Sequence, residues 1–430
     1  MKILIITRSY FPDINPYAFR FKAVAEYLVK QGHSVDIFTS HIPKTPKKET
    51  INNVKIFRHG SEKIKHCLNP KHLPSNKNDF RFKTIIRKTI RDMIRFAVKL
   101  FIWPDFAAFW AMYSYKELKN IVRENSYNAV ISVCLPFSDH LLALKIKKYV
   151  PNAVWIADVQ DPFYLSENFR YNNTLLYKKL NYAFERKVFK TADYITVTFK
   201  NTAKEYQSIF PENSDKIKII PHLVDLQMPD ITQKNYFDSS DKIRLIYIGT
   251  LEKKMRNPSY LLKLFTGLLK VYGQSNLELH FFGNINDCTF IFNRYKNLLD
   301  KKIFVHGIVS RDTIGNVMSS ADFLVNMGNK STYLLPSKIV EYVAFQKPII
   351  NLSVIADDTS AEFLRPYPIA INLLIGTQTI EEQVSKLVKF IKSPPKIEDT
   401  KKTSDWIDTF KINSVGSKYE GLILDGKRKK

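Results

Sequence analysis

The feature of this sequence that most constrains its fold is a rhythm of short apolar runs that alternate with helix-length segments. The rhythm begins with the β-branched run Ile3–Ile6 and pauses in the polar stretch 233–241. It starts again with Ile243–Ile248 and continues through the second half of the chain. Buried strands that alternate with helices of this length form parallel, doubly wound sheets, which bind ligands outside the carboxyl ends of their strands. The sequence therefore predicts two α/β domains with a ligand cleft between them.

The chain length supports two domains. At 430 residues the chain exceeds the ~250–300 residues at which single cores stop growing. We predict an N-terminal domain over residues 1–239, a C-terminal domain over 240–403, and a helical tail, 404–430, that packs back on the N-terminal domain. The three cysteines lie far apart and form no CxxC pair, which argues against a zinc site or a disulfide scaffold and fits a reducing compartment.

The charge balance points to a polyanionic partner. Lys and Arg number 66 against 41 Asp and Glu, which gives a formal net charge of +25. Such an excess suits nucleic acid, an anionic membrane face or a phosphorylated substrate. The first apolar run is too short for a signal peptide, and no uninterrupted run reaches the ~18 apolar residues of a membrane span. We therefore expect a cytoplasmic protein that is peripheral on the inner face of the cell membrane.

Basic residues recur at helical spacing within the segment 81–113. Arg87, Arg91, Arg95 and Lys99 are four residues apart and would share one face of a helix, whereas the apolar residues between them would share the other. A basic amphipathic helix of this kind suits the headgroup layer of an anionic bilayer. The alternative is an ordinary surface helix whose apolar face belongs to the core. Nucleic acid fits less well, because no nucleic-acid-binding motif accompanies the run.

The second half of the chain carries a pattern typical of an anion site. Pro336 and Ser337 would begin a helix, where free backbone N–H groups and the positive end of the dipole attract anions. Lys338 adds a full charge, which makes the place suitable for a diphosphate. Glu341 lies one turn further on the same side and could accept hydrogen bonds from ribose hydroxyls. The alternative is a proline-started helix with a capping serine and a solvated glutamate.

This stretch, PSKIVEYVAFQKP, resembles the PSK-x-x-E-Y-x-A-x-x-K/R-P signature of retaining GT-B glycosyltransferases. The resemblance is to the large "glycosyl transferases group 1" type of family that builds O-antigens, capsules and related polysaccharides. It implies an α/β, GT-B fold of two Rossmann-like, doubly wound domains facing each other across a cleft, a nucleotide-diphosphate-sugar donor, and retention of anomeric configuration. No cofactor is implied, and no metal, since the donor half shows no acidic metal-binding cluster. The resemblance covers nearly the whole chain, through ILIITRSYFPD, WPDFAAFW, VWIADVQDPFY, IIPHLVD, YIGTLEKKMRNP and FVHGIVSRDTIGNVMSSADFLV.

Several residues depart from the family pattern. Tyr333 stands where the family often has a second glutamate, so no donor sugar is predicted. Asn15 lies in a first loop that commonly carries Gly-Gly, and Thr250 stands where a basic residue usually follows a glycine. Gln160 stands where one subgroup tends to have arginine. We assign the missing positive charge of the donor loop to Arg256, because its Arg-Asn-Pro run precedes a helix.

Candidate catalytic residues follow from charge and position. Lys338 and Arg256 would stabilise the negative charge that grows on the leaving diphosphate. Asp158 and Asp161 end a strand and could orient the acceptor, although capping of the turn before a proline explains them equally well. His140 is the best histidine candidate, although an incidental histidine beside a helix-capping aspartate is an equal alternative. The predicted catalytic residues are Lys338, Arg256, His140 and Asp161; the donor-binding residues are Gly249, Thr250, Arg256, Gly283, Val309, Pro336, Ser337, Lys338 and Glu341; the acceptor-side residues are Asn15, Asp158, Asp161, Arg87, Arg91 and Arg95.

The sequence thus predicts a glycosyltransferase that moves a sugar from a nucleotide-diphosphate-sugar to a lipid-diphosphate-linked saccharide acceptor in cell-surface polysaccharide synthesis. A nucleotide-sugar epimerase of the same fold would need no lipid acceptor and would leave the basic segment 81–113 unexplained. A non-catalytic protein that kept the fold is also compatible with these residues, as is a polyanion-binding module driven by charge alone.

Overall fold

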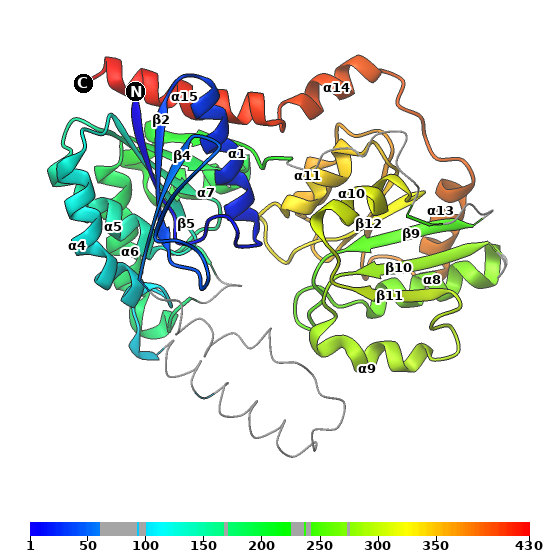
Figure 1. Ribbon diagram of the computed structural model, residues 1–430. Coiled ribbons are helices and arrows are strands. Elements are labelled where there is room, and N and C mark those ends of the chain that lie inside the picture. Colours follow the sequence, from blue (N-terminus) through cyan, green and yellow to red (C-terminus); the bar gives the residue numbers. More distant parts are fainter. Residues whose placement is uncertain (61–92, 94–99, 167–170, 225–235, 238–241, 273–275) are drawn as a thin grey trace. The chain divides into compact units, whose positions relative to one another are not determined.

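The chain divides into two compact units, each built around its own sheet (Figure 1). The first unit comprises Met1–Pro221 together with Ile412–Lys430, and the second comprises His222–Lys411. The first unit thus ends before residue 239 and includes only the last part of the predicted tail. The computed structural model describes residues 1–60, 93, 100–166, 171–224, 236–237, 242–272 and 276–430.

The sheet of the first unit has eight strands in the order β3-β4-β2-β1-β5-β6-β7-β8. Neighbouring strands are parallel except β3, which runs antiparallel to β4. The order reverses beside β1, so β1 and β5 flank a topological switch point at the carboxyl edge of the sheet. The strands are β1 (Lys2–Ile6), β2 (Ser34–Ser40), β3 (Lys48–Ile51), β4 (Val54–His59), β5 (Ala129–Cys134), β6 (Val154–Val159), β7 (Tyr194–Val197) and β8 (Ile217–Ile219), and the α-helices are α1 (Pro16–Lys30), α4 (Ala108–Glu124), α5 (Ser138–Ile146), α6 (Thr174–Thr191), α7 (Lys200–Ile209) and α15 (Ile412–Arg428).

The sheet of the second unit has six parallel strands in the order β11-β10-β9-β12-β13-β14. Here the order reverses between β9 and β12, which places the switch point beside the end of β9. The strands are β9 (Ile243–Ile248), β10 (Leu277–Phe282), β11 (Ile303–Gly307), β12 (Phe323–Met327), β13 (Ile349–Ser353) and β14 (Ala370–Leu374), and the α-helices are α8 (Ser259–Tyr272), α9 (Thr289–Phe292), α10 (Arg311–Ser319), α11 (Ser337–Ala344), α12 (Thr359–Phe363), α13 (Ile380–Lys392) and α14 (Thr400–Asp408).

These two parallel sheets with helical connections confirm the predicted α/β class. The strand expected at Ile243–Ile248 forms with those bounds, and its last four residues are buried, as expected for a strand inside a parallel sheet.

Helix α1 begins and ends as its sequence dictates. The side chain of Asn15 accepts a hydrogen bond from the backbone N–H of Ala18, and Pro16 occupies the first helical position, where its missing N–H costs nothing. Val24 and Leu28 are fully buried on the inner face of the helix. Gly32 follows the end of the helix with a φ of 81°, a conformation that a residue with a Cβ rarely adopts.

The C-terminal helix α15 packs on α1 and β6 of the first unit. A Cβ on Gly416 would lie 2.4 Å from the ring of Tyr27, so only glycine permits this approach of α15 to α1. The ring of Tyr419, one turn further, is fully buried. The far end of the chain therefore completes the N-terminal unit.

The segment 81–113 is described only in part, and the predicted basic face with Arg87, Arg91 and Arg95 lies outside the described residues. Two tryptophans towards its end pack into the first unit. Trp103 donates from Nε1 to Asn181 over 2.9 Å, and Trp110 is buried and donates to the carbonyl of His59. Across the described helices, none combines the length and apolar character needed to cross a bilayer.

Candidate functional site

Glycines stand at the carboxyl ends of three neighbouring strands, β9, β10 and β11. We name this part of the sheet the glycine edge. Gly249, Gly283 and Gly307 end or follow these three strands. The N–H of Gly249 donates to the carbonyl of Phe282 over 2.8 Å, and the N–H of Gly283 donates to the carbonyl of Gly307 over 2.7 Å. A Cβ on Gly283 would lie 2.2 Å from the carbonyl oxygen of Gly249. Only glycine at this position lets the two strand ends approach, which leaves bare backbone where a ligand can reach it.

Helix α11 starts with an uncapped N-terminus on the same unit. Pro336 is its N-cap and offers no side-chain hydrogen bond, so Ser337 is the first helical residue and not a capping serine. The first N–H groups of a helix have no partner within it, and together with the dipole they form an anion site. Ser337 and Lys338 are half-buried, so both can contact a ligand at this end.

Glu341 lies between two cations. It is only 7% exposed, and its Oε2 accepts a hydrogen bond from the ammonium of Lys338, three residues earlier. Its Oε1 lies 3.5 Å from Nη2 of Arg311, the first residue of α10. The sequence prediction missed Arg311, although the residue lies within FVHGIVSRDTIGNVMSSADFLV, one of the segments that carry the family resemblance. Its position directly after the helix-capping Ser310 is the signal that could have identified it.

Helix α11 is anchored to the end of β9. The hydroxyl of Tyr342 accepts a hydrogen bond from the N–H of Ile248 over 2.9 Å and lies 3.3 Å from the carbonyl of the same residue. Burial raises the pKa of Tyr342 far above its usual value, so the phenol stays neutral. On the other side of the helix start, Nε2 of His222 lies 3.1 Å from the carbonyl of Leu335, immediately before Pro336. These contacts fix the start of α11 beside the glycine edge.

The loop between β9 and α8 contributes further positive charge. Arg256 closes a tight turn by hydrogen bonds in both directions with Glu252, and its guanidinium lies 3.5 Å from the amide oxygen of Asn329. Arg256, Lys253, Lys254 and Lys330 line a cavity of about 260 Å³ beside the ends of β12 and β13. Among the described residues that line this cavity there is no carboxylate. The cavity is therefore suited to an anionic group.

Two further predicted donor residues lie on the same edge of this unit. Thr250 follows the end of β9 and accepts with its carbonyl from the hydroxyl of Tyr247 over 3.3 Å. Val309 is half-buried between β11 and α10. Tyr333, in the place of the family's second glutamate, is half-buried in the loop before α11, and its N–H donates to Ser331. The structure thus brings the donor-side residues together around the carboxyl ends of one sheet.

In the first unit, the predicted acceptor-side residue Asp158 is buried. Asp158 is 1% exposed and accepts hydrogen bonds from the hydroxyls of Thr196 and Tyr419. Arg20 joins this network through Tyr419 and the carbonyl of Ile220. The carboxylate of Asp158 is thus enclosed where α15 meets the sheet, and this burial does not fit the predicted contact with an acceptor.

His140 is also a core residue. It is 1% exposed, its Nδ1 lies 2.7 Å from the hydroxyl of Ser132, and its ring meets Phe137 edge-on. Burial lowers the pKa of His140 to about 3, so the ring is neutral near pH 7. A buried, neutral imidazole does not fit the predicted role in catalysis. Sequence reasoning failed here because the position after a strand suggested exposure, whereas His140 lies in the first turn of α5, which packs on β5.

Asp161 retains access to the carboxyl edge of the first sheet. It follows β6, is partly exposed, and accepts a hydrogen bond from the hydroxyl of Tyr17 on α1. Burial and the neighbouring carboxylate of Asp161 raise the pKa of Tyr17, so this phenol remains a donor. Asn15, two residues before Tyr17, is engaged as the helix cap and also donates to Asp13. Of the predicted acceptor-side residues that the structure describes, Asp161 is the best placed to meet a ligand.

A charged cluster at the switch point of the first sheet was not predicted. Asp105 is fully buried and accepts hydrogen bonds from the N–H and the hydroxyl of Ser138. Asp139 is also fully buried and accepts from the N–H of Arg8 over 2.7 Å. Burial raises the pKa of both carboxyls. In the part of the chain that the structure describes, no three His, Cys, Asp or Glu side chains are grouped as a metal site would require.

Comparisons with known proteins agree with this architecture. The profile of Glycosyltransferase Family 4 matches residues 20–228. Among curated proteins, none matches the chain significantly. Solved structures match over nearly the full length of both chains. A glycosyltransferase from Rickettsia africae ESF-5 is 14% identical, with a TM-score of 0.62 and coverage of 99% of this chain and 98% of that chain. WaaG, a glycosyltransferase involved in lipopolysaccharide biosynthesis, is 13% identical, with a TM-score of 0.60 and coverage of 98% and 99% of the two chains. A structure described as trehalose-6-phosphate from E. coli bound with UDP-2-fluoro glucose is 10% identical, with a TM-score of 0.59 and coverage of 99% of each chain.

At these identities the structural matches establish the fold, and they confirm the prediction of a GT-B architecture with two Rossmann-like sheets. Residues 20–228 thus match the profile of Glycosyltransferase Family 4, and the chain as a whole has the GT-B fold.

Proposed function

We propose that this protein transfers a glycosyl group from a nucleotide-diphosphate-sugar to a lipid-linked saccharide acceptor. The observation that carries the proposal is the uncapped start of α11, where Lys338 and Glu341 lie beside the glycine edge of the second sheet. One solved structure with the same fold holds a nucleotide-sugar analogue, UDP-2-fluoro glucose. The involvement of WaaG in lipopolysaccharide biosynthesis supports a role in cell-surface polysaccharide synthesis.

The proposed chemistry is electrostatic. Cleavage of a sugar–phosphate bond leaves negative charge on the diphosphate, and preorganised positive groups stabilise that charge most effectively. Lys338, Arg256 and the first N–H groups of α11 supply such groups in the second unit. We propose that they act without a metal ion or a cofactor and that the sugar is transferred with retention of configuration. Glu341 would accept hydrogen bonds from the ribose of the donor.

In the free protein, the carboxylate of Glu341 competes with a donor diphosphate for the ammonium of Lys338. The ammonium of Lys338 is already paired with the carboxylate of Glu341. A diphosphate would draw this ammonium towards the helix start, because it carries more charge than a single carboxylate. Arg311 would then keep Glu341 in position, since the guanidinium contacts the other carboxylate oxygen.

Exposed apolar side chains on the first unit support the proposal of a lipid-linked acceptor. The first turn of α6 exposes Leu175 by 91% and Leu176 by 63%, and Phe101 is 76% exposed. The hydroxyl of Tyr177 donates to the carbonyl of Leu100, which joins α6 to residue 101. We name Phe101, Leu175 and Leu176 the apolar patch. Exposed apolar side chains close in sequence to a basic segment suit the boundary of an anionic bilayer, and we propose the cytoplasmic face of the cell membrane.

The test is a panel of nucleotide-sugars incubated with lipid-diphosphate-linked saccharides. The proposal expects one donor to give a product whose mass exceeds that of the acceptor by one sugar, together with released nucleotide. Donors without acceptor should show only slow hydrolysis. Interconversion of nucleotide-sugars in the absence of an acceptor would identify an epimerase, and the absence of turnover with every donor and acceptor would contradict the assignment.

A further inference from the structure

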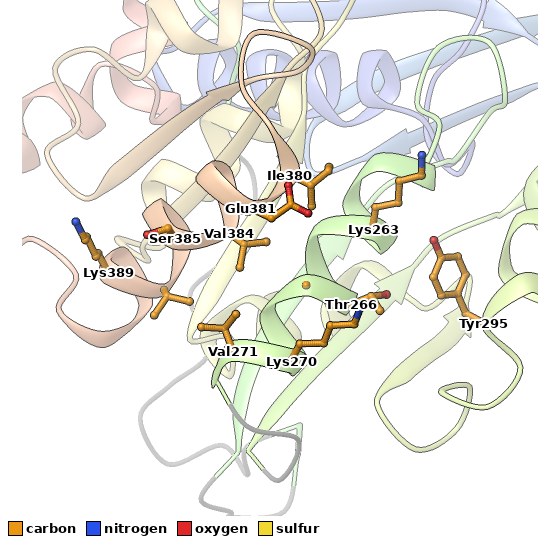
Figure 2. Close-up of a pocket in the computed structure, with 12 residues that line it drawn as sticks. Lys263, Thr266, Lys270, Val271, Tyr295, Ile380, Glu381, Val384, Ser385 and Lys389 are labelled. Carbon is orange, nitrogen blue, oxygen red and sulfur yellow. The ribbon is translucent and has the colours of Figure 1, made fainter.

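A second cavity on the second unit shares no lining residue with the basic cavity of the candidate donor site. It has a volume of about 580 Å³ and lies between α8 and α13 on the second unit. Figure 2 shows the side chains of Val271 and Val384 between these two helices. Volumes of this size are typical of sites for small molecules. None of the residues that line this cavity belongs to the predicted donor set.

The cavity has an apolar floor. Val384 and Val388 contribute side chains from α13, and Val271 contributes one from the last turn of α8. Val271 is 66% exposed, although removal of an apolar side chain from water lowers the free energy. The helices meet closely at Gly267, where a Cβ would lie 2.6 Å from Val384, and lining residues lie on both sides of this contact along each helix. The floor therefore offers unburied apolar surface next to rigid helix packing.

The rim of the cavity is basic. Lys263 and Lys270 lie on α8 and Lys389 lies on α13, and Figure 2 shows Lys389 on the opposite side of the cavity from Lys263. Glu381 is the single acid among the described lining residues. Long lysine stems add apolar surface, while their ammonium groups remain in water. An apolar floor with three lysines and one glutamate among its lining residues matches a ligand with an aliphatic chain and a negative head.

We infer that the cavity between α8 and α13 binds a free single-chain amphiphile with an anionic headgroup, of which a fatty acid carboxylate is the simplest case. The chain lies on the valine floor, and the carboxylate pairs with the lysines of the rim. This inference is independent of the proposed transferase activity, because the residues that line the cavity differ from those assigned to the donor site.

The test measures binding of dodecanoate to the full chain by calorimetry, at concentrations below micelle formation. Dodecyltrimethylammonium has the same chain with a positive head, and dodecyl maltoside has it with a neutral head. We expect dodecanoate to bind with one-to-one saturation, and the cationic amphiphile to bind about tenfold more weakly or less, because the rim repels it. Equal binding of all three amphiphiles, or no saturable binding of dodecanoate, would overturn the inference.

Two variants locate the site. Val271→Glu places a charge on the floor at an exposed position, where the fold tolerates it, and should abolish dodecanoate binding. Lys270→Glu should raise the Kd about tenfold. Lys386→Glu is the matched control, because Lys386 is exposed on α13 but does not line the cavity, and it should leave the Kd within about twofold. Equal effects of Lys270→Glu and Lys386→Glu would show attraction by overall charge alone and would overturn the inference. Thermal unfolding of each variant confirms that the fold is retained.

Discussion

The guanidinium of Arg311 lies 3.5 Å from the carboxylate of Glu341 and thereby joins the start of α10 to α11. The opposite oxygen of the same carboxylate accepts from Lys338. Two cations therefore hold Glu341 in place, Lys338 from its own helix and Arg311 from α10. Lys338 is half-buried at the helix start and can turn to a phosphate, whereas Arg311 approaches from another helix. This arrangement separates a charge that can move to the ligand from one that keeps Glu341 in place.

Replacement of Arg311 tests this separation. In Arg311→Met, Glu341 has only Lys338 as a partner, so the ion pair competes more strongly with the donor diphosphate and the ribose contact is less well positioned. We expect the KM for the donor to rise about tenfold while kcat changes less. Steady-state kinetics with varied donor measures both constants. Arg311→Lys should restore part of the affinity, and an unchanged KM in Arg311→Met would contradict the positioning role.

Removal of the positive groups at the proposed diphosphate site should affect kcat. Lys338→Met and Arg256→Met each delete a charge that stabilises the leaving group, and we expect a loss of about 100-fold in kcat for each. Single-turnover assays with saturating donor measure the loss. Lys386→Met, an exposed lysine on α13, serves as the matched control. Activities within about twofold of the unaltered protein in both site variants would place the diphosphate elsewhere.

The apolar patch predicts vesicle binding that depends on two leucines. Leu175→Glu combined with Leu176→Glu removes exposed apolar surface and adds negative charge, so binding to vesicles that contain anionic lipid should fall about tenfold or more. Flotation of the protein with such vesicles measures this change. Leu424→Glu on α15, where the side chain is 41% exposed, provides the control and should bind as before. If the double variant floats as efficiently as the control, the patch does not contact lipid.

Local signals in the sequence predicted the elements well, whereas burial of the polar candidates escaped prediction. Asn15 and Ser310 both cap helices through contacts that lie within four residues, to the N–H groups of Ala18 and Thr313, so such caps can be recognised locally in a sequence. Asp158 looked available because it ends a strand. Its enclosure depends on Tyr419, which lies 261 residues further along the chain. Contacts at such separations leave no periodic signal in a single sequence.

The network around Tyr419 predicts a stability effect in the first unit. Tyr419→Phe removes the hydroxyl that donates to Asp158 and accepts from Arg20, and leaves both charged groups buried with one partner fewer. We expect the free energy of unfolding to fall by about 1–3 kcal/mol. Urea unfolding followed by circular dichroism measures it. Tyr27→Phe is the control, because it removes only a long hydrogen bond, 3.4 Å, from the hydroxyl to Glu420 near the surface. The free energy of unfolding of this variant should change little. Similar losses in both variants would argue against the buried network.

The carboxyl of Glu185 predicts how stability depends on pH. Its oxygens accept hydrogen bonds from the N–H of Tyr164 over 2.9 Å and from the hydroxyl of Tyr206 over 2.7 Å, and they fix the loop that carries Asp161. Burial raises the pKa of Glu185 from 4.5 to about 7 in the folded protein. The folded state therefore binds this proton more tightly than the unfolded state does. The resulting stabilisation is complete below pH 4.5 and is lost as the pH rises through 7.

Glu185→Gln keeps the shape of the side chain and cannot ionise, so it should remove this loss. Between pH 4.5 and pH 8, the variant should gain on the order of 3 kcal/mol of stability relative to the unaltered protein, which follows from a pKa difference of about 2.5 units. Paired urea titrations at the two pH values measure the difference. Glu212 is the control of opposite sign, because its contact with Arg186 lowers its pKa, so Glu212→Gln should lose stability relative to the unaltered protein as the pH rises. A Glu185→Gln profile parallel to that of the unaltered protein would mean that folding does not raise the pKa of Glu185.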